Sequence, residues 1–266
     1  MPAELLFWYG LALKMVLTAG IVVGASVAVE RSGPFIGALI ATLPTAASAA
    51  YLILALEHPP SFVAASAATN AAVAIFALSY AWLAQRHGVL LSISIAILVW
   101  FCAAAALRLV DWTPAGVLAL NAAVLAITIP ATARFRRYSI PRKAIERTRY
   151  DLPLRAVAAA LVVAAVTTAS HHIGSFASGT FAVFPIVMGT FVVILHLHAG
   201  GKAASAVFAH AQPPLFGLCL CFLAIHYLAG PIGVWWAYAA GLAVTVSWSG
   251  VLWLVRRWQG WIPNRR

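Results

Sequence analysis

Residues 61–84 read SFVAASAATNAAVAIFALSYAWLA and contain no charged side chain. As an α-helix they would extend for about 36 Å, which exceeds the roughly 30 Å of a bilayer's hydrocarbon core. The run does not alternate between apolar and polar residues, as a strand of a membrane β-barrel does. Turn-forming residues bound it on both sides, in Glu57-His58-Pro59-Pro60 and Gln85-Arg86-His87-Gly88. We therefore expect a transmembrane helix here.

The composition of the whole chain agrees with this prediction. Of its 266 residues, 64% are hydrophobic and 9% are charged, and the mean hydropathy is +0.96. A soluble domain carries about 25% charged residues, so this chain lacks the polar surface that water requires. In lipid every backbone polar group must be paired within the protein. The expected fold is therefore all-α, a polytopic transmembrane helical bundle.

Turn-forming residues divide the chain into about nine apolar runs, and only one connection, 134–153, is long. This connection is strongly basic and too short to be a domain. We expect an N-terminal membrane half, 1–133, with five spans, the basic loop 134–153, and a C-terminal membrane half, 154–266, with four spans. The expected spans are 5–29, 34–56, 61–84, 89–109, 115–133, 154–171, 175–197, 203–228 and 232–255.

The positions of Lys and Arg orient the bundle in the membrane. If loop 134–153 is cytoplasmic, nine spans place the N-terminus outside and the C-terminus inside. Fifteen of the 17 basic residues then lie on the cytoplasmic side, whereas Arg108 lies outside and Lys14 within a span. We expect a multi-pass protein of the bacterial inner membrane. The first run lacks a basic start and a small-residue cleavage site, so we do not expect a cleavable signal peptide.

The net charge of +11 would suggest nucleic acid in a soluble protein. Here the basic residues flank apolar runs, so we expect them to meet membrane lipid head groups and no nucleic acid. The three cysteines, Cys102, Cys219 and Cys221, lie in expected spans without disulfide or zinc-ligand spacing. We expect no metal and no cofactor. A homo-oligomer is left open.

An internal duplication is suggested by two self-alignments. A shift of 141 residues aligns 33–57 with 174–198, with seven of 25 positions identical, Pro44 and Pro185 among them. These runs cross the membrane in opposite senses, as in the inverted repeats of secondary transporters. A shift of 117 residues instead pairs two runs of the same sense. One simple duplication does not explain both alignments.

Residues 37–45, GALIATLPT, precede a short loop and an Ala-rich span. This pattern resembles the GlpM family of small bacterial inner-membrane proteins, and the part that begins at Phe184-Pro185 resembles it more loosely. The resemblance covers roughly 30–84 and 174–255. It implies a doubled four-span unit with an extra central span in the inner membrane, and it implies no particular substrate.

The prolines Pro44 and Pro185 lie near the middle of the second and seventh runs. A proline removes its own N–H donor and frees the carbonyl four residues earlier. Helices broken at matching places in two halves indicate a binding site at the membrane midplane, although a proline can also merely kink a membrane helix. The flanking hydroxyl residues of this candidate substrate site are Thr42, Thr45, Ser178 and Thr180.

Two titratable residues complete the candidate substrate site. Lys14 lies about 13 Å into its run and either meets an anionic substrate or extends to the head groups. His210, just before Gln212-Pro213-Pro214, is expected inside the bundle, where it could bind a ligand or relay a proton. Four further polar residues in the runs are expected to form interhelical hydrogen bonds: Asn70, Asn121, Thr128 and Thr132.

All six acidic residues lie at the ends of runs or in loops. Cation-coupled carriers commonly use a carboxylate within the membrane, and an enzyme would need an acid/base pair or triad. The sequence therefore favours a small secondary transporter or permease for an anionic or neutral solute, and it argues against an enzyme. The alternative is a non-transporting membrane partner that scaffolds an envelope or polysaccharide assembly complex.

Overall fold

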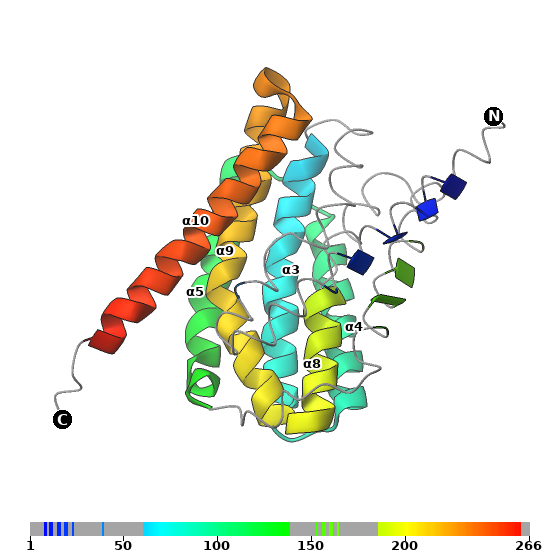
Figure 1. The fold of residues 1–266 in the computed structure, drawn as a ribbon, viewed down its shortest axis with the longest axis vertical. Helices are drawn as coiled ribbons and strands as arrows, with labels where there is room; N and C mark the ends of the chain where they lie inside the picture. Colours follow the sequence, from blue (N-terminus) through cyan, green and yellow to red (C-terminus); the bar gives the residue numbers. More distant parts are fainter. Residues whose placement is uncertain are drawn as a thin grey trace.

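The structure is a computed structural model. It describes residues 61–138 and 186–261 continuously, together with scattered helical positions between 8 and 39 and between 153 and 164. All regular elements in these described residues are helical (Figure 1). They are α3 (Ser61–Leu83), α4 (Val89–Leu107), α5 (Pro114–Thr132), the short 3₁₀ helix η1 (Ala133–Arg137), α8 (Ile186–Ala199), α9 (Gly201–Ile232) and α10 (Val234–Trp261).

The prediction of an all-α bundle is confirmed for this part of the chain. Four stretches are long and apolar enough to cross a membrane: Val89–Leu107, Pro114–Arg137, Gly201–Ile232 and Val234–Trp258. The expected runs at 61–84, 89–109, 115–133 and 203–228 agree with α3, α4, α5 and α9 to within four residues. The run 232–255 corresponds to α10, which ends six residues later, at Trp261. Most of the first, second and sixth expected spans, residues 175–185 of the seventh, and both proline breaks of the proposed repeat lie outside the described residues. The rest of the seventh expected span lies in α8.

The local sequence explains where these helices begin and end. Thr113 caps α5, because its Oγ1 accepts a hydrogen bond from the Gly116 N–H at 3.1 Å, and Pro114 follows at the first helical position. Gly200, between α8 and α9, and Gly233, between α9 and α10, have φ values of 81° and 80°. Only glycine adopts this conformation without a steric penalty, so both tight connections depend on it.

Helices α3 and α9 form the centre of the described bundle (Figure 1). Helix α3 contacts α4, α5 and α9, whereas α9 contacts α3, α5, α8 and α10. The facing surface of α3 is rich in alanine, which lets neighbouring helices approach closely. Phe208 of α9 fits between two rings of α3, with its centroid 5.6 Å from that of Phe76 and 5.1 Å from that of Tyr80. The core therefore combines small and aromatic residues from both helices.

The outer surfaces of α4 and α10 are apolar. Leu90 and Leu98 of α4 and Trp235 and Trp236 of α10 are all exposed. Helix α10 packs chiefly on α9, and its C-terminal end diverges from the other described helices (Figure 1). Such surfaces suit contact with lipid, which supplies an apolar solvent for them.

Candidate anion-binding site

Buried polar side chains join α3, α5 and α9. Asn70 Nδ2 donates to Asn121 Oδ1 and to the Leu215 carbonyl, both at 2.9 Å. Further along, Thr128 Oγ1 donates to Gln212 Oε1 at 2.9 Å, while Gln212 Nε2 donates to the Ala74 carbonyl at 3.0 Å. The prediction that Asn70, Asn121 and Thr128 form interhelical hydrogen bonds is confirmed. Thr132 instead donates within its own helix, to the Thr128 carbonyl at 2.8 Å. These bonds fix the relative positions of the three helices.

Two prolines interrupt the hydrogen bonding of α9 directly after this polar cluster. Pro213 and Pro214 have no N–H, so the carbonyls of Ala209 and His210 lose their helical donors. The helix nevertheless continues, as membrane helices with proline do when neighbours pair the freed groups. Trp248 of α10 contacts the same turn, because its Nε1 donates to the Pro213 carbonyl at 3.0 Å. The Pro213–Pro214 turn is therefore attached to α10.

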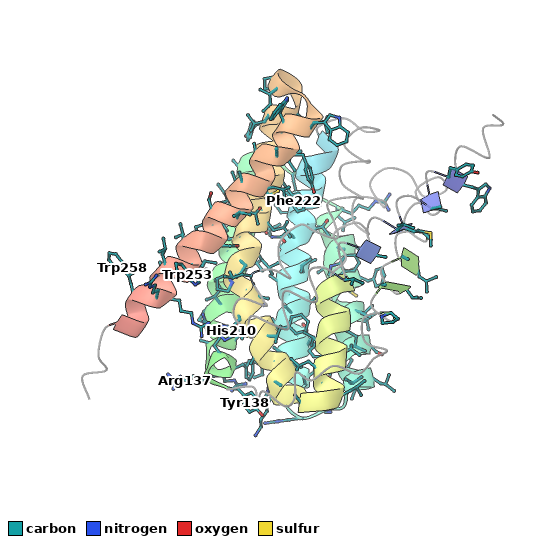
Figure 2. The ribbon with its side chains drawn as sticks, viewed as in Figure 1. Arg137, Tyr138, His210, Phe222, Trp253 and Trp258 are labelled. Carbon is teal, nitrogen blue, oxygen red and sulfur yellow. The ribbon has the colours of Figure 1, made fainter. Side chains whose placement is uncertain are left out.

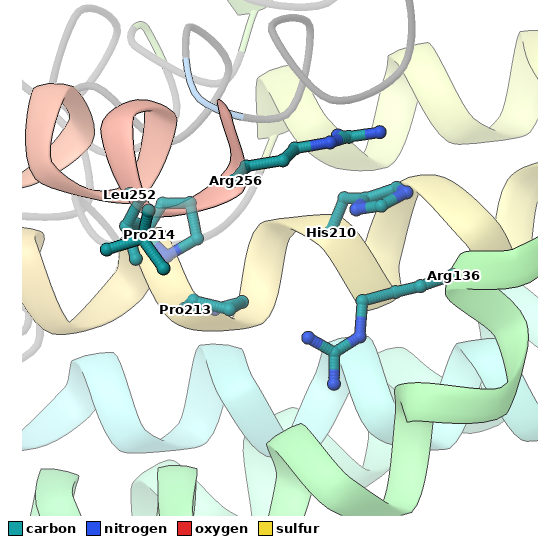
Figure 3. Close-up of a pocket in the computed structure, with 7 residues that line it drawn as sticks. Arg136, His210, Pro213, Pro214, Leu252 and Arg256 are labelled. Carbon is teal, nitrogen blue, oxygen red and sulfur yellow. The ribbon is translucent and has the colours of Figure 1, made fainter. Parts of the chain in front are cut away.

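A cavity of about 320 Å³ lies beside this turn, between α9, α10 and η1 (Figure 3). Its volume falls at the lower end of the range for ligand pockets, about 300–1,000 Å³. Three of its lining residues are basic or carry an imidazole, and no acidic residue is among the lining residues that the structure describes. We call it the basic cavity; it is lined by Arg136, His210, Pro213, Pro214, Leu252, Val255 and Arg256.

The short helix η1 positions Arg136 in the basic cavity. Its neighbour Phe135 is buried and meets the Trp82 ring of α3 edge-on, with centroids 6.1 Å apart. The Arg134 guanidinium lies 3.9 Å from the same Trp82 ring, a favourable cation–π distance. Arg136 itself donates from Nη2 to the Ile129 carbonyl near the end of α5, at 3.0 Å. This side chain is therefore held by a helix C-terminus, where a cation is stabilised.

His210 lies between the two arginines of the basic cavity (Figure 3). The Arg136 backbone and the Arg136 and Arg256 side chains all act on it electrostatically. Its half-buried position on α9 agrees with the prediction that it lies inside the bundle. Three elements that are distant in sequence thus line one cavity with two arginines and one histidine, and the two guanidinium groups lie on opposite sides of the His210 ring in Figure 3.

This arrangement suits an oxyanion. Guanidinium groups bind carboxylate and phosphate through paired N–H donors, and bonds to a charged acceptor are about twice as strong as neutral ones. The described residues contain one acidic side chain, Asp111, which lies between α4 and α5. None of the described His, Cys, Asp and Glu residues forms a group of three suited to a metal ion. The charge and the hydrogen-bond donors of the basic cavity therefore suit an anion.

The other predicted site residues are not located by the structure. Of the candidate substrate-binding set, His210 lies in the described part of the chain. The remaining members lie outside the described residues: Lys14, Thr42, Pro44, Thr45, Ser178, Thr180 and Pro185.

Arg136 and Arg256 line the basic cavity but are not among the site residues expected from the sequence. In the sequence they served only to orient the bundle in the membrane. The sequence did contain a hint of this site, because residues 136, 210 and 256 all lie near the cytoplasmic ends of expected spans.

Comparison with known proteins adds no relative: no protein-family model, no curated protein and no solved structure matches the chain.

Proposed function

We propose that the protein is a small secondary transporter or permease that moves an anionic solute across the bacterial inner membrane. The observation that carries this proposal is the basic cavity, where Arg136, Arg256 and His210 surround about 320 Å³ and no described lining residue is acidic. A cation would be repelled from such a site, and a neutral solute would not need its charges. The anionic class is therefore favoured over the neutral one.

The proposed orientation places this cavity near the cytoplasmic face. Seven of the eight Lys and Arg residues in the described part lie at the end of the bundle that holds the basic cavity, and Arg108 lies at the other end. This asymmetry supports an outside N-terminus and a cytoplasmic C-terminus. The midplane site between Pro44 and Pro185 remains part of the proposal, and the basic cavity is then where the anion is held at the cytoplasmic end of its path.

Transport is tested with the full-length protein in proteoliposomes. Uptake is measured for radiolabelled inorganic phosphate, sulfate, dicarboxylates and sugar phosphates, with a neutral sugar and a cation for comparison. We expect uptake of at least one anion, and a reduction of about ten-fold or more in Arg136→Ala and in Arg256→Ala, because each removes a charge-assisted hydrogen-bond donor. Pro44→Ala and Pro185→Ala are expected to slow transport of the same anion.

Arg257→Ala is the matched control. Arg257 neighbours Arg256 but lies 5.4 Å from the Trp253 ring and does not line the basic cavity. Its removal changes the net charge by the same amount and should leave uptake unchanged. Absence of transport for every anion, or equal losses in Arg257→Ala and Arg256→Ala, contradicts the proposal.

A second candidate function is a non-transporting membrane partner that scaffolds an envelope or polysaccharide assembly complex. The observation that favours it is the closely packed interior between α3, α5 and α9, where Asn70, Asn121 and Gln212 are each fully buried and hydrogen-bonded across helices. Such packing gives a rigid unit. Co-purification of one partner at fixed stoichiometry, combined with no transport of any solute, would support this function instead.

A further inference from the structure

The walls of the basic cavity change from polar to apolar along the membrane normal. On α9, Pro213 and Pro214 follow His210 by about one turn. On α10, which runs in the opposite sense, Leu252 precedes Arg256 by one turn. Both helices therefore present a charged or imidazole side chain toward the end of the bundle and apolar side chains one turn closer to its middle. A small hydrated anion makes no favourable contact with the apolar part of the basic cavity.

The basic cavity also borders the surface that faces lipid. Val255, which lines it, is 49% exposed, and the neighbouring Val251 and Leu254 are exposed as well. Helix α10 diverges here from the other described helices (Figure 1). A ligand can therefore approach from the side, through the membrane, without crossing the closely packed interior.

The turn of α10 beside the basic cavity has the features of the lipid head-group level. Trp253 and Trp258 are exposed on it (Figure 2), and the Arg257 guanidinium lies 5.4 Å from the Trp253 ring. Tryptophan and arginine side chains gather where the hydrocarbon meets the head groups. Arg256 is adjacent to Arg257 in this turn, so we expect its guanidinium at the depth of lipid phosphates.

From this geometry we propose that the basic cavity binds the phosphate of an anionic phospholipid taken from the cytoplasmic leaflet. Arg136 and Arg256 bind the phosphate oxygens, and His210 lies between them. The first part of the acyl chains lies against Pro213, Pro214 and Leu252. The inference rests on the anion site of the proposed function and specifies an amphiphile as its ligand class. Basic cavities between membrane helices on the cytoplasmic side are suited to such head groups.

Phospholipids and soluble phosphates both carry a phosphate group, and the experiment distinguishes these two kinds of ligand. Full-length protein is purified in a neutral detergent, stripped of lipid and titrated, with tryptophan fluorescence as the readout. The probes are short-chain phosphatidylglycerol, short-chain phosphatidylcholine, glycerol phosphate and inorganic phosphate. We expect phosphatidylglycerol to bind at least about ten-fold more tightly than the other three. The ammonium of phosphatidylcholine is repelled by the arginines, and the soluble phosphates lack the acyl chains.

Matched variants assign the binding to the basic cavity. Arg136→Ala and Arg256→Ala should each weaken phosphatidylglycerol binding about ten-fold, and Arg257→Ala should not change it. Leu252→Ser should weaken it several-fold, whereas Leu254→Ser, an exposed neighbour outside the cavity, should not. If an alanine variant does not fold, Arg136→Lys and Arg256→Lys take its place in the binding measurement. They keep the charge but lose the paired donors, so they should bind phosphatidylglycerol more weakly than the unaltered protein.

The outcomes separate this inference from the proposed function. Equal affinity for inorganic phosphate or phosphatidylcholine, equal losses in Arg257→Ala, or unchanged affinity in both lysine variants overturns the lipid ligand. Selective phosphatidylglycerol binding without transport of any anion supports the lipid ligand and contradicts transport. Anion uptake that depends on Arg136 in vesicles of phosphatidylcholine alone, without phosphatidylglycerol binding, supports transport and contradicts the lipid ligand.

Discussion

Gly201 lies where α9 begins and meets the end of α3. A Cβ atom here would overlap the Ala84 carbonyl and approach the His196 ring at 3.2 Å. The same region is joined by hydrogen bonds, because Ser205 Oγ donates to the Ala81 carbonyl at 2.8 Å and Tyr80 Oη lies 2.9 Å from His196 Nδ1. Glycine at 201 is therefore required for α3, α8 and α9 to approach this closely.

Replacing Gly201 tests this contact directly. Gly201→Ala should lower the free energy of unfolding by about 1–3 kcal/mol, because backbone must move to admit the methyl group. The matched control is Gly230→Ala, also in α9, where an added Cβ meets no atom within 4 Å. The control should be neutral or slightly stabilising. Thermal unfolding of both proteins in detergent measures the difference, and equal midpoints would contradict the close approach.

The polar residues show how far residue-level prediction from the sequence extends. Asparagine and threonine in an apolar run need partners, so Asn70, Asn121 and Thr128 were expected to bond between helices, and they do. The partners were less predictable. Gln212 bonds both Thr128 and the Ala74 carbonyl, and those contacts depend on the register of three helices. The sequence of a single apolar run does not determine how three helices are aligned along one another.

At the scale of elements, α9 and α10 approach each other through glycines. An added Cβ at Gly241 of α10 would lie 2.9 Å from Cys221 Sγ, and one at Gly217 of α9 would lie 2.6 Å from the Trp248 ring. Thr245 Oγ1 also donates to the Gly217 carbonyl at 3.2 Å. Small residues at such a crossing allow close backbone contact in a membrane. This crossing positions the turn that carries Arg256.

Enlarging one of these glycines should separate the two helices. Gly241→Leu is expected to destabilise the protein by about 1–3 kcal/mol and to remove anion binding, because Leu252 and Arg256 move away from α9. Gly250→Leu, on the same helix but with no atom within 4 Å of an added Cβ, should do neither. Thermal unfolding and ligand titration measure both effects. Wild-type ligand affinity in Gly241→Leu would show that the crossing does not position the basic cavity.

The elements themselves were largely predictable because membrane helices carry their signal in continuous apolar length. Four of the expected runs agree with described helices to within four residues, and a fifth corresponds to α10 but ends six residues before it. The exact extent of α9 was less predictable. The expected run was 203–228, but the helix covers Gly201–Ile232 and continues through Pro213, Pro214 and Pro231.

At the scale of the whole molecule, the described basic residues define two unequal ends. Seven of the eight Lys and Arg residues in this part lie at the end with η1 and the basic cavity. The sequence predicted this asymmetry from the order of spans alone. It did not predict the basic cavity, because residues 136, 210 and 256 meet only through the packing of η1, α9 and α10.

The orientation follows from this asymmetry and can be measured by cysteine labelling. In a variant without Cys102, Cys219 and Cys221, a cysteine is placed at His87 or at Asp111, both of which are exposed. A membrane-impermeant maleimide should label Asp111→Cys in intact cells and label His87→Cys only after the membrane is opened. The reverse pattern would place the basic end outside and contradict the proposed topology.

The most direct test of the central claim is a density map of the full-length protein in nanodiscs that contain phosphatidylglycerol. We expect density for a phosphate group between the Arg136 and Arg256 side chains, beside His210, with acyl-chain density along Pro213 and Leu252. An empty cavity in that lipid, or one filled by a carboxylate of the chain's own basic loop, would contradict the account.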